Sequence, residues 1–276
     1  MILCDAWLQS RFSMGLSAVI ALDAARAAPK KERGGFMIAK YFKDYDKRII
    51  KKKKPTAKGP AKKGKAAAGG ALDTKLLKES LSGIIPSFLK IDAVKIIDSA
   101  GFSPDGVDLA AYREHYPQII DIMGGYVPYE LIHGMFHVVQ NLDKDSLVEM
   151  LGKIATAKKL NMYAAEQEED EARTGIPSFV IAASSKYQFI ELKNDIINYY
   201  LSKNVEYRHE LDILMIVNKG IVVKNWREKR SFIALETKED TFLWFFILMN
   251  EYLDVKKVLD IDFRKYVKKE IRYNEY

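Results

Sequence analysis

Asp108 is the residue of this sequence best placed to do chemistry. It follows the turn-forming segment GFSPDG (101–106) and lies in a short apolar stretch, 107–112, whose composition predicts a β-strand. A carboxylate at the start of a strand can ligate a divalent cation, and it can equally accept hydrogen bonds from backbone N–H groups. The sequence leaves both roles open.

A second stretch, 132–140, predicts a longer strand that carries two histidines. His133 and His137 are four residues apart and would lie on one face of that strand. A zinc site needs at least a third protein ligand, and none is in view, so no metal site is expected here. Glu130 lies in the preceding V-P-x-E turn and is expected to be structural rather than catalytic.

The elements around these strands follow a recognisable order. Further along the chain, a helix, three extended stretches and a strongly apolar segment, 240–253, are expected to extend the sheet and pack across it. A helix, three strands, a helix and a strand outline the restriction-endonuclease-like fold, an α/β fold with a mixed sheet flanked by helices. Periodicity and turn residues place these six elements at 74–85, 94–97, 107–112, 132–140, 143–160 and 179–183.

Residues from about 76 to 253 also resemble an uncharacterised, mainly bacterial family of nuclease-fold domains of the PD-(D/E)xK type. The resemblance implies that Asp108 matches the first acid of the family's site. The family's Glu-x-Lys pair falls on His137 and Val139, so one position in three matches. The landmarks that carry the resemblance are VKIIDSAGFSPDGVDLAAY (94–112), VPYELIH (127–133), FHVVQNLDKDSL (136–147), FVIAA (179–183) and the apolar segment after Thr241.

The residues at these two positions decide what activity the resemblance supports. Two carboxylates facing one cleft bind Mg²⁺, and a lysine on the same strand face stabilises charge. Neutral imidazole is a poor Mg²⁺ ligand, and valine has no polar atom. We therefore expect a catalytically degenerate domain, without a cofactor, that acts as a nucleic-acid-associated binding or scaffold module.

Two alternatives stay open. The chain could be an active Mg²⁺-dependent nuclease of defence or DNA processing, using Asp108, Glu130 and a lysine from a neighbouring element such as Lys153. It could also be a structural subunit of a ribonucleoprotein or phage assembly. The nuclease arrangement requires that the carboxylates of Asp108 and Glu130 reach one ion.

The net charge of +7 is concentrated in one part of the chain. Residues 30–65 hold 15 Lys or Arg and 3 Asp or Glu, so they carry +12 and the remaining residues carry −5. Residues 51–70 have no apolar period, which predicts a disordered linker. We expect this linker to neutralise nucleic-acid phosphates, although a merely solvated linker would have the same composition. Its lysines are Lys51, Lys52, Lys53, Lys54, Lys58, Lys62, Lys63 and Lys65.

Four parts are expected along the chain: an N-terminal extension (1–36), a basic tail (37–71), the nuclease-like domain (72–258) and a charged C-terminal segment (259–276). The extension is either an amphipathic helix or a segment upstream of a translation start at Met37. A single cysteine excludes an internal disulfide and fits a reducing, cytoplasmic setting. The longest uncharged run of the N-terminal extension, from residue 12 to residue 22, is far shorter than the ~20 residues of a membrane span, so no membrane partner is expected.

Overall fold

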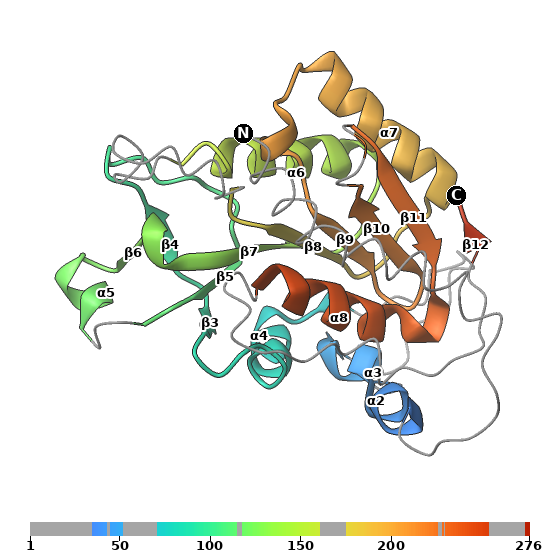
Figure 1. The fold of residues 1–276 in the computed structure, drawn as a ribbon, viewed down its shortest axis with the longest axis horizontal. Coiled ribbons are helices and arrows are strands. Elements are labelled where there is room, and N and C mark those ends of the chain that lie inside the picture. Colours follow the sequence, from blue (N-terminus) through green and yellow to red (C-terminus); the bar gives the residue numbers. More distant parts are fainter. Residues whose placement is uncertain are drawn as a thin grey trace, which may run out of the picture.

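A mixed sheet of eight strands forms the centre of the fold (Figure 1). Strands β7, β8 and β9 run parallel to one another, and all other neighbours are antiparallel. In spatial order the strands are β12 (Asn274–Glu275), β11 (Phe232–Glu236), β10 (Gly220–Lys224), β9 (Ile213–Ile216), β8 (Ser178–Ala182), β7 (Ile132–Val139), β5 (Leu109–Tyr112) and β3 (Lys90–Asp92). The computed structural model describes residues 35–42, 45–51, 71–114, 118–160, 175–225, 228, 230–253 and 274–276.

Helices cover both faces of this sheet. Helices α6 (Lys144–Ala157) and α7 (Phe189–Ser202) pack on one face, and α8 (Thr241–Leu253) packs on the other together with α4 (Thr74–Ser82) (Figure 1). The types of element follow the predicted order of helix, three strands, helix and strand, as α4, β3, β5, β7, α6 and β8, so the restriction-endonuclease-like fold class is confirmed. Short 3-10 helices complete the path at Tyr129–Leu131 (η2), Tyr207–His209 (η4) and Lys238–Asp240 (η5).

The first strand of the predicted order was assigned to the wrong residues. Strand β4 (Lys95–Ile97) pairs in parallel with β6 (Tyr126–Pro128) in a separate two-stranded sheet, next to the short helix α5 (Ile119–Ile122). The first strand of the main sheet is β3, which has only three residues. A strand of that length shows no measurable periodicity, whereas the apolar run that includes β4 does resemble a strand.

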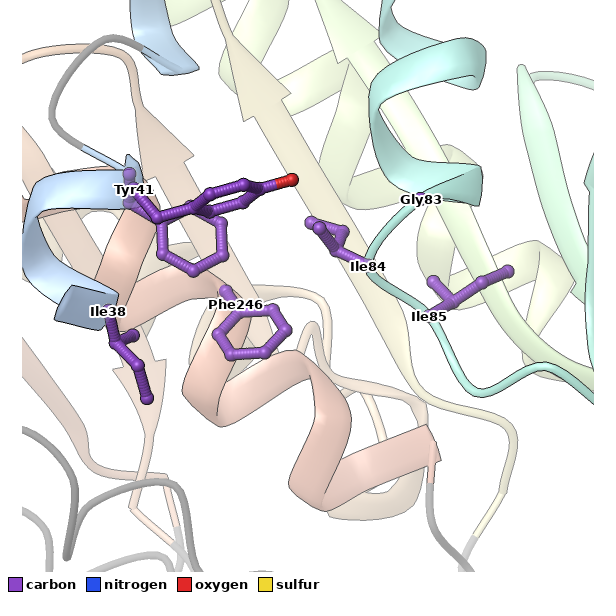
Figure 2. A pocket seen from close by; sticks show the side chains of 7 residues that line it. Ile38, Tyr41, Gly83, Ile84, Ile85 and Phe246 are labelled. Atoms are coloured by element: carbon purple, nitrogen blue, oxygen red, sulfur yellow. The ribbon is translucent and has the colours of Figure 1, made fainter.

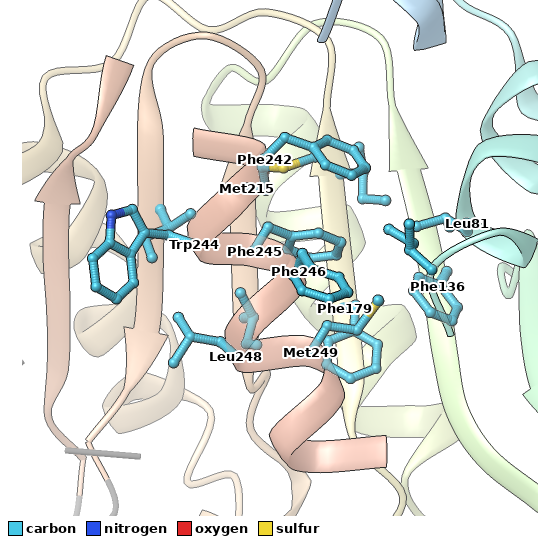
Figure 3. Close-up of a cluster of buried hydrophobic side chains, with 14 of the residues drawn as sticks. Leu81, Phe136, Phe179, Met215, Phe242, Trp244, Phe245, Phe246, Leu248 and Met249 are labelled. Atoms are coloured by element: carbon cyan, nitrogen blue, oxygen red, sulfur yellow. The ribbon is translucent and has the colours of Figure 1, made fainter. Parts of the chain in front are cut away.

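Helix α8 is apolar on all sides and almost wholly buried. Figure 3 shows Phe242, Phe245 and Phe246 on the side of α8 toward Phe179 of β8 and Leu81 of α4, and Trp244 on the opposite side. A helix that is hydrophobic all round must be covered all round, and the 240–253 segment does pack across the sheet as expected. Among the described residues, no helix combines the length and apolarity that crossing a bilayer requires.

The side of α8 that faces away from the sheet is covered by residues 35–42 and 45–49, which precede the lysine-rich linker (51–70). Helices α2 (Gly35–Phe42) and α3 (Tyr45–Ile49) place Phe42 and Tyr45 against α8, with the ring centroids of Phe42 and Phe246 4.7 Å apart. Both side chains are buried in the main core, so the packed unit begins well before residue 72. Residues 1–34, 52–70 and 254–273 lie outside the described residues.

Candidate functional site

Asp108 lies directly before β5, at the end of the ladder that β5 forms with β7. Its backbone N–H donates to the carbonyl of Phe136 at 2.9 Å, and its Oδ2 accepts the N–H of Val138 at 2.6 Å. The carboxylate thus accepts a backbone hydrogen bond, which is one of the two roles that the sequence leaves open for it. Within the described part of the chain, its Oδ1 accepts no hydrogen bond that would compete with a ligand.

His137 lies beside Asp108 on the adjacent strand and points toward α6. Its Nδ1–H donates to the carbonyl of Gly106 at 2.7 Å, which leaves Nε2 unprotonated, buried and without a hydrogen-bond partner among the described residues. Burial lowers the pKa of His137 to about 4, and the charges of Lys158 and Lys153 add to that effect. The imidazole is therefore neutral near pH 7 and holds the turn that leads into Asp108.

The other two predicted positions hold no catalytic group near Asp108. Val139 packs against the apolar cluster under α6 and α7. Glu130 lies in η2, before the first residue of β7, whereas Asp108 binds Val138 near the last. At ~3.3 Å per residue, the span from 132 to 138 alone is about 20 Å. The structure does not bring Glu130 and Asp108 together.

Helix α6 places Lys153 beside the turn that leads into Asp108. The side chain of Lys153 crosses Gly106, where an added Cβ would lie 2.6 Å from Lys153 Cδ. Lys153 Nζ binds Glu149 Oε1 at 2.5 Å, one helical turn earlier. Gly106 has φ +85°, so both its conformation and its lack of a side chain permit this approach.

The charges of this site act on one another. Partial desolvation raises the pKa of Asp108 above its usual value, while the hydrogen bond from Val138 and the charge of Lys153 act in the opposite direction. Lys153 is therefore close enough to stabilise the ionised carboxylate. Its own side chain and that of Glu149 are 45% and 66% exposed, so both can meet a substrate from solvent.

A buried ion pair fixes the far end of α6. Lys158, just after the helix, binds the Asp212 carboxylate, and both side chains are nearly inaccessible to solvent. The same oxygen of Asp212 accepts the N–H of Ser178 at 2.8 Å, at the start of β8. At its other end α6 begins with a capping box, in which Asp143 accepts the N–H of Ser146 at 3.0 Å. The helix that carries Lys153 is thus held at both ends.

Sequence reasoning missed Glu149. The available signal is the E-x-x-x-K spacing of Glu149 and Lys153, which puts both on one face of the predicted helix. That spacing is common on solvated helices. Only the packing of α6 over the Gly106 turn shows that Lys153, to which Glu149 is bound, lies beside Asp108.

The two histidines of β7 do not share a face, contrary to expectation. The ladder between β5 and β7 shifts register between Ala111 and Tyr112, which adds a residue to β7 near His133. His133 consequently lies edge-on to Phe88, with ring centroids 6.3 Å apart, while His137 faces α6. Within the described ranges, no cluster of three or more His, Cys, Asp or Glu could hold a metal ion.

The ends of the basic stretch are joined at the end of β7. Strands β1 (Ile50–Lys51) and β2 (Ala71–Leu72) pair antiparallel, so Lys51 belongs to a strand. The Gln140 side chain accepts the N–H of Leu72 at 2.8 Å and donates to its carbonyl at 2.9 Å. Gln140 is two residues from Val138, the partner of Asp108. The other seven predicted phosphate-binding lysines, between residues 52 and 65, lie outside the described residues.

Comparison with known proteins identifies the fold. No protein family matches the sequence, and no curated protein matches it at a significant level. Apo NucC of E. coli MS115-1 is 16% identical and superposes with a TM-score of 0.60 over 85% of this chain and 98% of its own. The cAAA-bound form of P. aeruginosa ATCC27853 NucC is 13% identical, with a TM-score of 0.57 over 86% and 98%. The cAAA-bound E. coli form gives 16%, 0.58, 87% and 98%. At these identities the likeness concerns the nuclease-type fold.

Proposed function

We propose that this protein is a metal-dependent nuclease in which helix α6 supplies the catalytic groups that strand β7 lacks. The observation that carries the proposal is the position of Lys153, which crosses Gly106 beside Asp108 and binds Glu149. An acid from the sheet, an acid from the helix and a lysine between them restore the types of group that His137 and Val139 do not provide.

Each group has a role that its surroundings support. Asp108 and Glu149 would hold Mg²⁺, which can be bound through only one or two carboxylates together with water and substrate phosphate. The bound metal would polarise the phosphodiester and acidify a water molecule. Lys153 would stabilise the negative charge that develops on the phosphate, since its side chain is partly exposed and its charge acts on Asp108.

Nucleic acid is the substrate class that the charge distribution favours. The seven lysines between residues 52 and 65 lie in a segment whose two ends join the domain at β1 and β2, next to the end of β7. A segment of this length, tethered at both ends, can reach roughly 30 Å from its base at ~3.3 Å per residue. The lysines could therefore contact phosphates of a strand bound at Asp108.

Cleavage of single- and double-stranded DNA and RNA, with Mg²⁺ or Mn²⁺ and with EDTA, tests the proposal. We expect metal-dependent cleavage that falls about 10²–10³-fold in Lys153→Met and at least as far in Asp108→Asn. Glu149→Gln should raise the metal concentration needed for half-maximal rate. Lys159→Met and Glu191→Gln, at exposed positions outside the site, are the matched controls and should cleave normally.

A second candidate is a nuclease-fold protein that binds nucleic acid without cutting it. The neutral, buried His137 and the apolar Val139 favour it, because both fill the strand positions with groups unsuited to Mg²⁺. Binding that is unchanged by Asp108→Asn, with no cleavage of any substrate in either metal, would establish this candidate and reject the nuclease.

A further inference from the structure

An apolar pocket of about 480 Å³ opens between α2, α8 and the loop that follows α4. Figure 2 shows Tyr41 reaching from α2 toward Ile84, with Phe246 of α8 beneath it. The volume lies within the range of about 300–1,000 Å³ that is typical of sites for small ligands or side chains. The complete lining is Ile38, Tyr41, Phe42, Gly83, Ile84, Ile85 and Phe246.

The chemistry of this lining favours apolar side chains as the occupant. Phe42, Ile84 and Phe246 form its floor and belong to the main hydrophobic core. Tyr41 at the rim is 52% exposed. No charged side chain lines the pocket, and the carbonyl of Ile84 already accepts a hydrogen bond from Asn250 at 3.2 Å. An apolar occupant would extend the core outward.

We infer that residues 8–20 of the same chain dock in this pocket as an amphipathic helix. The segment is LQSRFSMGLSAVI, and five of its apolar residues recur at intervals of four, four, three and one, with Met14 outside this series. That spacing puts them on one side of a helix. Arg11 and the serines then lie mostly on the opposite side. The stripe consists of Leu8, Phe12, Leu16, Val19 and Ile20.

The connection to the pocket is short. The segment joins the domain at Gly35, the first residue of α2, and Ile38 and Tyr41 of that same helix line the pocket. Residues 21–34 form the connection, and a flexible chain of that length spans about 20 Å on average. Gly34 and Gly35 permit a tight reversal of the chain. The tether makes the effective concentration of the segment about millimolar, which favours it over a separate partner.

Hydrogen exchange of the full-length protein tests this inference. We expect amides of residues 8–20 to exchange at least tenfold more slowly in the natural protein than in Phe12→Asp or Tyr41→Asp. Phe12 precedes the described residues, and its substitution leaves every residue that lines the pocket unchanged. Ile190→Asp is the control, because Ile190 is similarly exposed, at 48%, on α7 and far from the pocket.

Protection that disappears in both test variants and persists in Ile190→Asp would support intramolecular docking. Equal exchange in all four proteins would overturn the inference. Protection that grows with protein concentration would also overturn it, because the occupant would then be the segment of a second copy.

Discussion

His137 should make the stability of this protein depend on pH in a way that one substitution removes. Its pKa is about 4 in the folded protein, against 6.5 for an ordinary histidine. The folded state therefore binds fewer protons than the unfolded state below pH 6.5, and stability falls as pH decreases toward 4. At 1.36 kcal/mol per pKa unit, the shift is worth about 3 kcal/mol by pH 4. That is a large part of the ~5–15 kcal/mol that stabilises a typical domain.

The variant His137→Asn isolates this contribution, since an asparagine amide can still donate to the Gly106 carbonyl and does not titrate. Its free energy of unfolding should lie about 1–2 kcal/mol below that of the natural protein at pH 7, because of lost packing. By pH 4 the variant should equal or exceed it. Urea unfolding of both proteins at several values between pH 7 and pH 4 gives the difference, in which all other titrating groups cancel. A constant difference across that range would refute the reasoning, since it would mean that His137 becomes protonated without cost in the folded state.

Three further outcomes are expected for the ion pair of Lys158, the Gly106 turn and the lysine-rich segment. Lys158→Met should lower the free energy of unfolding by about 3–5 kcal/mol, because it leaves the buried Asp212 carboxylate without its ion-pair partner. Adding Asp212→Leu should restore part of that loss, and unfolding of the single and double variants measures both effects. Gly106→Ala should destabilise the fold by about 1–2 kcal/mol, because alanine is strained at the positive φ of this position. It should also reduce cleavage, since the added methyl group displaces Lys153. A loss of stability with normal cleavage would contradict the role of Lys153. If about five lysines of residues 51–65 neutralise phosphates, the logarithm of the affinity for duplex DNA should fall with a slope of about −4 to −5 against the logarithm of the salt concentration. Replacing the seven lysines from 52 to 65 by glutamine should make this slope shallower. Equal slopes for the natural protein and the variant would show that DNA binds elsewhere.

The fold could be predicted because its signals are local. Turn residues before Asp108, the cap at Asp143 and the apolar run of α8 each specify an element from a few neighbouring residues. Strand β3 could not be found in this way, because three residues carry no period and its pairing partner β5 supplies most of its definition. Helices α2 and α3 show an aromatic stripe in the sequence, but the surface that buries it, α8, lies about two hundred residues further along.

The candidate site was harder to predict, for reasons of geometry. Asp108 was found because it begins a strand after a turn. Glu149 and Lys153 depend on how α6 rotates over the sheet, which is set by contacts such as the ion pair of Lys158 with Asp212. The face of His133 depends on an irregularity in the ladder between β5 and β7 that leaves no mark in the sequence.

The two hydrogen bonds between the Gln140 side chain and Leu72 separate the stability of the domain from the length and charge of the segment between β1 and β2. The ends of the lysine-rich segment are already held at one place by β1, β2 and this side chain, so the folded domain does not depend on what lies between them. Doubling the length of a closed flexible loop costs only about 0.6 kcal/mol. The number of lysines and their reach can therefore vary by insertion, deletion or duplication while the turn around Asp108 and Lys153 stays intact. Any affinity of this segment for a polyanion would then change without altering the geometry at Asp108.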